Sequence, residues 1–418
     1  MQPLASLVTE ALALKRQGLE WPAVAQRLNA QYGTALTAEG IRQRCKRARL
    51  ATSLDDGDSA GEAAAPPAPP AVSLPEQVTT MRAKMEREHE RQLYQQLLRE
   101  KARTDIIVEA LQSAIQALPA THAPMAPVMP HHPRKAEESV LVISDAQIGQ
   151  WTRAEETGGL GGYDLATFAQ RAEILRQSVT NITRLHQQHG NLPTLNVFLA
   201  GDLVDGESIF PNHLAHIDID VVGQVLTAVD VFAPMLIDLL GLYQTIRVLA
   251  VSGNHGRVGK SKKEPGSRFR VNWDYIVAKF LQARLSQYDR ITWTVPESWF
   301  AIQEIQGWRF LVHHYDVIKS WMNLPYYGLD RYDGRFSRVL HSRGQDYHYM
   351  VGGHFHNYAN VETPVGEWII NGAWPGASYH SLRDLAVASR PSQMFFGVHP
   401  DHGISWRYKI DLSSPLER

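Results

Sequence analysis

Hydrophobic positions divide the chain into segments with different periods. From about residue 138 to the end, short apolar runs typical of buried strands, such as SVLVIS, LNVFLA and IRVLAV, alternate with amphipathic stretches that predict helices. Residues 76–118 lack glycine and proline and carry apolar side chains at helical spacing, from Ile107 to Leu118. The pattern therefore predicts an α/β domain preceded by a helical segment.

The first fifty residues predict a small all-α domain. LASLVTEALALKRQG and WPAVAQRLNAQYG each show helical spacing and end at a glycine, and AEGIRQRCKRARL predicts a third helix after Thr37. Three short helices, the last of them basic, resemble a homeodomain-like or Myb-like helix-turn-helix, in which the third helix enters the DNA major groove. The residues expected to contact DNA are Arg42, Arg44, Lys46, Arg47 and Arg49. A protein-docking bundle and an ordinary basic helix are the alternatives.

Composition marks the borders between these parts. Residues 51–75 and 119–136 are rich in proline and alanine with few large apolar side chains, which is typical of linkers. The sequence thus predicts five consecutive segments, namely a helix-turn-helix-like domain at 1–50, a linker at 51–75, a helical segment at 76–118, a second linker at 119–136 and an α/β domain at 137–418. The 76–118 helix could also join two copies of the chain as a homo-oligomer.

The overall composition is that of a soluble globular protein. Of 418 residues, 44% are hydrophobic and 20% are charged, and the chain has a single cysteine, Cys45. One cysteine excludes an internal disulfide and a cysteine-rich zinc site, so a reducing, cytoplasmic location is expected. We find no signal-peptide pattern. The most apolar stretch, Val221–Tyr243, is interrupted by Asp230 and Asp238, which favours a buried helix over a membrane span.

The net charge of −1 conceals two basic regions. Residues 1–50 contain eight lysines and arginines against three glutamates, and residues 256–270 contain six against one. Such asymmetry predicts a polyanionic partner such as DNA, the alternative being a solvated basic surface.

Polar groups able to bind metal follow the apolar runs at five places. They are Asp145 and Gln147, Asp202 and Asp205, Asn254 and His255, His313 and His314, and His354 and His356. In an α/β sheet the loops at the carboxyl ends of strands meet at one edge, so we expect these side chains to converge. Carboxylate, imidazole and amide oxygen together suit divalent transition metals.

The ordered motifs DxQ, GDxxD, GNHG, H and GHxH resemble those of the calcineurin-like metallophosphoesterase superfamily. The resemblance covers about residues 138–411 and is strongest to phage- and prophage-type members, which show a similar GNHGR segment and a similar NGAWPGAS segment. It implies a four-layer α/β sandwich holding two divalent metal ions that hydrolyse phosphoesters through a metal-bound hydroxide.

The resemblance also assigns roles by position. Asp145, Gln147, Asp202 and His356 would hold one metal, and Asp202, Asn254, His313 and His354 the other. His313 is preferred to His314 because it directly follows the apolar run FLV. His255 would act as general acid or charge stabiliser, and Asp205 would orient it. Most members have histidine where this chain has Gln147, which makes Mn²⁺ the expected metal, with Fe, Zn or Mg²⁺ as alternatives.

Residues that follow the metal motifs are expected to bind substrate. Arg257 and Lys260 lie in the second basic region, His213 and His216 follow the GDxxD motif, and His314 follows the expected ligand His313. Aromatic side chains could supply a surface on which bases stack, namely Trp299, Trp321, Tyr326 and Tyr327. Together with the basic N-terminal domain, they favour a DNA-directed phosphodiesterase or nuclease. The alternatives are a nucleotide phosphodiesterase or phosphatase for a small or protein substrate, and a DNA-binding or assembly protein with a vestigial metal site.

Overall fold

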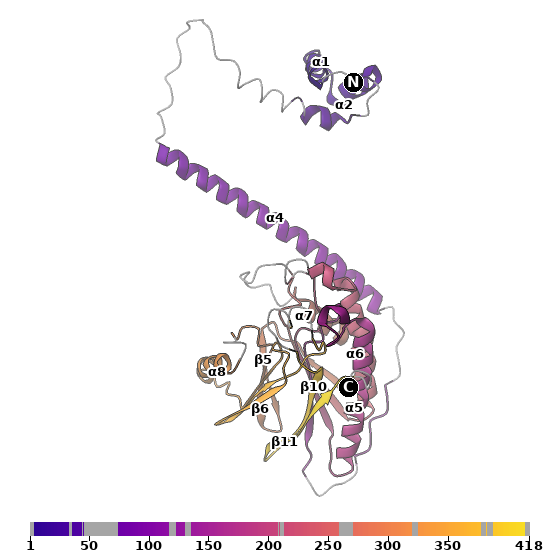
Figure 1. Cartoon of the computed structure of the whole chain (residues 1–418), viewed down its shortest axis with the longest axis vertical. Coiled ribbons are helices and arrows are strands. Elements are labelled where there is room, and N and C mark those ends of the chain that lie inside the picture. The colour runs from indigo at the N-terminus through magenta and orange to yellow at the C-terminus, as the bar shows by residue number, and fades with distance from the viewer. Residues whose placement is uncertain are drawn as a thin grey trace. The chain divides into compact units, whose positions relative to one another are not determined.

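The computed structural model describes residues 4–32, 36–43, 45, 74–116, 123–129, 135–207, 209, 213–258, 271–319, 325–377, 382 and 388–413. These residues form two compact units, Met1–Glu88 and His89–Arg418. Helix α4, Leu74–Gln116, crosses the border between the units and matches the helix predicted at 76–118 (Figure 1). Within the second unit, Ile107 and Val108 of α4 pack against the main core.

Before α4, the described part of the N-terminal unit has three short helices around a core of its own. They are α1 (Leu4–Arg16), α2 (Trp21–Tyr32) and a short helix over residues 38–43. Ala11, Val24, Leu28 and Ile41 are among its buried residues. The small all-α domain that the sequence predicts is therefore present, while its resemblance to helix-turn-helix DNA-binding domains stays a prediction.

The second unit is built on a six-stranded sheet with the order β11-β10-β1-β2-β3-β4. Strands β1 to β4 are parallel, and β10 and β11 add antiparallel pairs at one side. The strands are β1 (Glu138–Ile143), β2 (Thr194–Ala200), β3 (Thr245–Val251), β4 (Ile291–Thr294), β10 (Ser392–His399) and β11 (Gly403–Asp411). Because β1, β2 and β3 are parallel neighbours, the loops after Ile143, Ala200 and Val251 leave the sheet at the same edge.

A second, five-stranded sheet has the order β5-β6-β7-β9-β8. Strands β6, β7 and β9 are parallel, so their carboxyl ends also share an edge. The strands are β5 (Phe300–Ile305), β6 (Trp308–His313), β7 (Tyr349–Gly352), β8 (Ala359–Thr363) and β9 (Gly366–Ile370).

Helices cover the outer face of each sheet. The first sheet is covered by α5 (Leu165–Gln187), α6 (Val221–Leu240) and α7 (Trp273–Arg284), and the second by α8 (Tyr326–His341). The described loops also contain the 3-10 turns η1 (Ala154–Thr157) and η2 (His213–His216). Side-chain caps set the start of α5, α6 and α7, as where Asp164 accepts a hydrogen bond from the Thr167 amide at 2.7 Å.

Alternation along the strands separates three apolar layers. In β1, Leu141 faces the core beneath α5, α6 and α7, whereas Val140 and Val142 face the core between the two sheets. In β6, Val312 faces that central core, whereas Leu311 faces a third core beneath α8. The order helix, sheet, sheet, helix confirms the predicted four-layer α/β sandwich.

Helix α6 is long and apolar enough to cross a membrane by length and composition. In this fold it is a core helix, because Val225, Phe232, Leu236 and Leu239 are buried against the first sheet and its neighbouring helices. This agrees with the expectation of a buried helix in Val221–Tyr243.

Candidate metal centre

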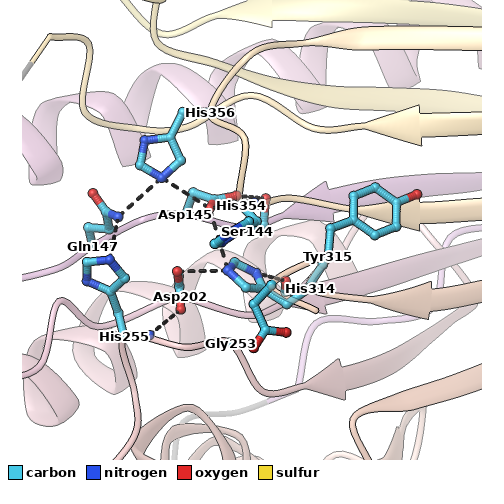
Figure 2. Close-up of polar contacts among 12 residues, drawn as sticks. Ser144, Asp145, Gln147, Asp202, Gly253, His255, His314, Tyr315, His354 and His356 are labelled. Atoms are coloured by element: carbon cyan, nitrogen blue, oxygen red, sulfur yellow. Dashed lines mark hydrogen bonds and ion pairs between the residues drawn. The ribbon is translucent and has the colours of Figure 1, made fainter. Parts of the chain in front are cut away.

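Loops from both sheets bring carboxylate, amide and imidazole groups together at the carboxyl ends of their strands (Figure 2). Asp145 follows β1, Asp202 follows β2, Asn254 and His255 follow β3, His314 follows β6, and His354 and His356 follow β7. The convergence expected from the sequence is therefore seen in the structure.

The backbone of these loops is unusual. Of the seven non-glycine residues with positive φ in the described chain, six lie at this edge: Asp145, Gln147, Asp202, Tyr315, His354 and His356. Such conformations are rare outside glycine and cost free energy, so they persist only where the surrounding structure enforces them. Their clustering marks this edge as a functional site.

Two glycines allow the acidic side chains to approach neighbouring backbone. A Cβ atom on Gly253 would overlap the carboxylate of Asp202, and one on Gly353 would overlap that of Asp145. Both positions therefore require glycine for steric reasons, which explains the GN and GH pairs of the motifs in physical terms.

Asp202 lies at the middle of the cluster. Its Oδ1 accepts a hydrogen bond from the His255 amide at 2.7 Å, and its Oδ2 lies 2.7 Å from His314 Nε2. His314 Nδ1 lies 2.8 Å from the Ala200 carbonyl oxygen, to which it donates. Burial alone would lower the pKa of His314, but the charge of Asp202 raises it to about 10. Without a bound cation, the imidazolium of His314 thus neutralises the buried carboxylate.

Asp145 is fully buried beside this pair. Its Oδ2 accepts from Ser144 Oγ at 2.5 Å and its Oδ1 accepts from the His354 amide at 2.8 Å. His356 Nε2 lies 3.4 Å from Asp145 Oδ1 and 3.2 Å from the amide nitrogen of Gln147. A half-turn of that amide would present its oxygen at the same place. Gln147 therefore lies beside Asp145 and His356, and its role as a metal ligand stays a prediction.

The remaining groups supply neutral donors. Burial and the charge of His314 lower the pKa of His354 to about 3, so its imidazole is neutral and can bind metal through a nitrogen lone pair. The side-chain oxygen of Asn254 is buried without a hydrogen-bond partner among the described residues. An unpartnered buried oxygen costs free energy unless something else binds it.

These observations fit a divalent cation site. Ligand atoms of Asp202, His314 and His354 all lie within 4.8 Å of one another, and the unpartnered oxygen of Asn254 belongs to the same edge. Mixed carboxylate, imidazole and amide donors suit Mn²⁺, Fe²⁺ or Zn²⁺.

His255 is held by a second hydrogen-bonded group. Its Nδ1 lies 2.9 Å from Asp205 Oδ1, and its Nε2 points toward the Gln147 amide at 3.5 Å. The other oxygen of Asp205 lies 2.7 Å from His213 Nε2, and the Ile209 amide donates to His213 Nδ1 at 3.3 Å. With Nδ1 accepting, His213 carries its proton on Nε2 and donates to Asp205. Asp205 therefore contacts both His255 and His213, and the catalytic role predicted for His255 stays a prediction.

One contributor was not found from the sequence. Asp274, in the first turn of α7, accepts hydrogen bonds from the amides of Asp202, Leu203 and Gly253 at 2.8–2.9 Å. It thereby fixes the loops after β2 and β3 to each other. The residue sits in the unremarkable segment NWDY, about seventy positions after Asp202, so no local motif points to it.

Several residues predicted to bind metal or substrate lie elsewhere than expected. His314, and not His313, contacts Asp202, because side chains alternate along β6 and His313 points to the α8 side, where its ring lies 5.1 Å from that of Tyr332. His213 is buried on Asp205 instead of lining a substrate cleft. His216 is half-buried and accepts from the Trp151 amide through its carbonyl oxygen. Arg257 forms an ion pair with Asp316.

Only some of the basic residues expected to bind DNA or substrate belong to the described part of the chain. Arg42 is exposed near Glu39 at 3.8 Å. Lys260, Arg44, Lys46, Arg47 and Arg49 lie outside the described residues.

No protein-family model matches the chain, and no curated protein matches it. Among solved structures it is similar to the zinc complex of Vps29 from Entamoeba histolytica, with 12% identity, 66% of this chain and 99% of that chain covered, and a TM-score of 0.27. It is also similar to a predicted phosphoesterase from Streptococcus pneumoniae (9% identity, 66% and 99% covered, TM-score 0.27) and to an archaeal phosphodiesterase (10% identity, 65% and 99% covered, TM-score 0.28). Likenesses of this size carry no information on substrate, so the chemistry must follow from the residues themselves.

Proposed function

We propose that this protein is a divalent-metal-dependent phosphoester hydrolase directed to DNA. The observation that carries the proposal is the cluster of Asp145, Asp202, Asn254, His314 and His354, with His255 held beside it by Asp205. His314 takes the ligand role that the sequence had assigned to His313. Asp202 lies at the middle of the cluster and suits a ligand shared by two cations.

Divalent cations held there would acidify a water molecule and neutralise charge on the phosphate oxygens. The chain's own residues prepare the departure of the leaving group. The carboxylate of Asp205 accepts a hydrogen bond from the Nδ1–H group of His255. The other ring nitrogen, Nε2, therefore faces the cluster and can donate a proton to the leaving oxygen. Burial opposes the charged imidazole, but the charge of Asp202 and the hydrogen bond to Asp205 raise the pKa of His255 to about 9. Bound cations would lower that pKa toward neutrality, where a general acid works best.

The proposal that the substrate is DNA rests on the positive charge of residues 1–50 and on their place in a separate helical unit. Residues 1–50 carry eight lysines and arginines against three glutamates in a separate helical unit, and Arg42 on its last described helix is exposed. Cations on a compact helical unit neutralise phosphates and release counterions, which gives binding without base contacts. The linker and α4 tether this unit to the hydrolase, so bound DNA is concentrated near the site.

The test compares four substrates with and without Mn²⁺: single- and double-stranded DNA, bis-(p-nitrophenyl) phosphate and p-nitrophenyl phosphate. We expect metal-dependent cleavage of DNA and of the diester. An Asn254→Ala/His255→Ala variant should lose at least about a hundredfold in rate, since general acid catalysis alone contributes about 10² to 10⁴. His341→Ala changes an exposed histidine paired with Asp346 on the surface and should change nothing. Turnover of the monoester without DNA cleavage would contradict the DNA substrate and indicate a phosphatase. Metal binding with no turnover on any phosphoester would contradict the enzyme itself.

A further inference from the structure

A groove lies between α8 and residues 317–319, which follow the candidate ligand His314. It has a volume of about 940 Å³. The lining residues used below are Lys319, Tyr327, Arg331, Tyr332, Arg335 and Phe336. We propose that this α8 groove binds a single strand of nucleic acid whose phosphodiester is hydrolysed at the metal centre. This inference rests on the proposed function and names the form of its substrate.

The amphipathic pattern of α8 builds the groove. Leu329 and Leu340 are buried against the second sheet, and Tyr332 and Phe336 pack at the edge of the same core. Arg331 and Arg335 lie beside this apolar face, on the flank of the helix that borders the groove, and are exposed. Arg331 and Arg335 are one helical turn apart, about 6 Å along the axis, and both line the groove. The helix thus presents two cations in a row over an aromatic floor.

The charge of the groove is uncompensated. Among the described residues that line the groove, none is acidic. Within the described chain, no ion pair involves Lys319, Arg331 or Arg335. Two nearby carboxylates have other partners, since Asp316 pairs with Arg257 and Asp333 accepts a hydrogen bond from Tyr347. Asp330, which precedes Arg331 on α8, is exposed and is not among the residues that line the groove. Three free cations therefore favour an anionic occupant with more than one phosphate.

Aromatic side chains supply the other half of the recognition. Tyr327 lines the groove and is 62% exposed, and Trp299, outside the lining, is 40% exposed. Trp299 donates from Nε1 to Tyr332 Oη at 3.4 Å and lies 6.2 Å from the ring of Phe336. Unpaired bases can stack on such rings, whereas a duplex hides its base faces within the helix. The combination of cations and rings favours a single strand.

The groove is joined to the metal centre through the chain itself. His314 contacts Asp202, and the loop that lines the groove begins three residues later with Val317. A turn closed by the Ile318 amide on the Tyr315 carbonyl at 2.9 Å leads from one to the other. On the other side, the ring of Tyr332 lies 5.1 Å from that of His313, the residue before the ligand. The groove and the metal centre are therefore built from neighbouring residues of the same stretch of chain.

The experiment measures binding of fluorescein-labelled, phosphorothioate-linked dT12 to the full chain with Mn²⁺, by anisotropy at several salt concentrations. We expect Arg331→Ala/Arg335→Ala to raise Kd at least about tenfold and to reduce the slope of log Kd against log salt by about 1.4, which is 0.7 for each lost phosphate contact. Tyr327→Ala should raise Kd at least about fivefold and Tyr327→Phe should restore it, since the ring and not the hydroxyl stacks. The matched control is Arg338→Ala, an exposed arginine of α8 outside the groove, which should bind as wild type. Melting temperatures of all variants check that each is folded.

The outcomes separate the groove from the proposed function. Wild type that cleaves DNA, together with groove variants that bind dT12 as tightly and with the same salt slope, would overturn the groove alone. An equal loss in binding of a duplex of the same length would overturn the preference for a single strand. Wild type that hydrolyses bis-(p-nitrophenyl) phosphate but does not bind or cleave DNA would overturn both proposals. Loss confined to single strands, absent in Arg338→Ala, supports the groove.

Discussion

Asp274 lies outside every sequence motif, yet it links the two loops that carry Asp202 and Gly253. Its two oxygens accept three backbone amides from the loops that carry Asp202 and Gly253. Burial and the neighbouring charge of Asp202 raise the pKa of Asp274 to about 6, so its environment favours the protonated form more than water does. What it contributes is acceptor oxygens for amides that would otherwise be buried unpaired.

We therefore expect Asp274→Asn to destabilise the fold by about 1–3 kcal/mol, because one acceptor oxygen becomes an amide group that faces a backbone donor. Urea denaturation of the metal-free protein measures the free energy of unfolding. Asp289→Asn provides the control, since Asp289 is an exposed aspartate in the loop between α7 and β4. Equal stability of the two variants would show that the three hydrogen bonds contribute nothing measurable.

At the scale of elements, the alternation of side chains along β6 explains why His314, which follows the strand, reaches the centre, whereas His313, its last residue, does not. The run FLV identifies the strand and its end, but it does not say which face each side chain takes. In the structure Val312 and His314 face the first sheet, whereas Leu311 and His313 face α8. Burial lowers the pKa of His313 to about 3, so it is a neutral side chain in an apolar layer.

This assignment predicts different results for the two neighbours. His314→Ala should abolish binding of at least one metal equivalent, measured by elemental analysis after dialysis against Mn²⁺. His313→Leu should keep the metal content of wild type, because leucine suits the apolar layer beneath α8. Loss of metal in His313→Leu with retention in His314→Ala would restore the ligand expected from the sequence.

The sequence predicts this fold well because its strands are short apolar runs that end in glycine and polar residues. Asp145, Asp202 and His354 could be located from such ends alone, since parallel strands bring their ends to one edge. Groups defined by side-chain direction or by distant pairing could not be located. His213 follows GDLVDG as a substrate residue would, yet it turns inward onto Asp205. Asp274 contacts Asp202 only through the packing of α7.

At the scale of the whole molecule, the chain joins two compact units that have different compositions. The first, Met1–Glu88, is helical and basic near its start, and the second, His89–Arg418, carries the metal centre and the α8 groove. The segment 51–75 contains many prolines and alanines, which suit a tether more than a packed interface. Under the proposed function, the first unit would capture DNA and the second would carry out the chemistry.

Removing residues 1–75 therefore tests the division directly. For long DNA we expect the KM of the shortened chain to rise at least about tenfold, because the effective concentration that the tethered unit provides is lost. For bis-(p-nitrophenyl) phosphate we expect kcat/KM to stay the same, since the metal centre and its supporting residues, Asp205, His213 and Asp274 among them, all lie in the second unit. Raising the salt concentration should weaken cleavage by the full chain more than by the shortened one, as fewer phosphate contacts remain to be screened. Parallel loss of both activities would instead mean that the N-terminal unit supports the hydrolase fold, and unchanged cleavage of DNA would leave its basic helix without a role in substrate capture.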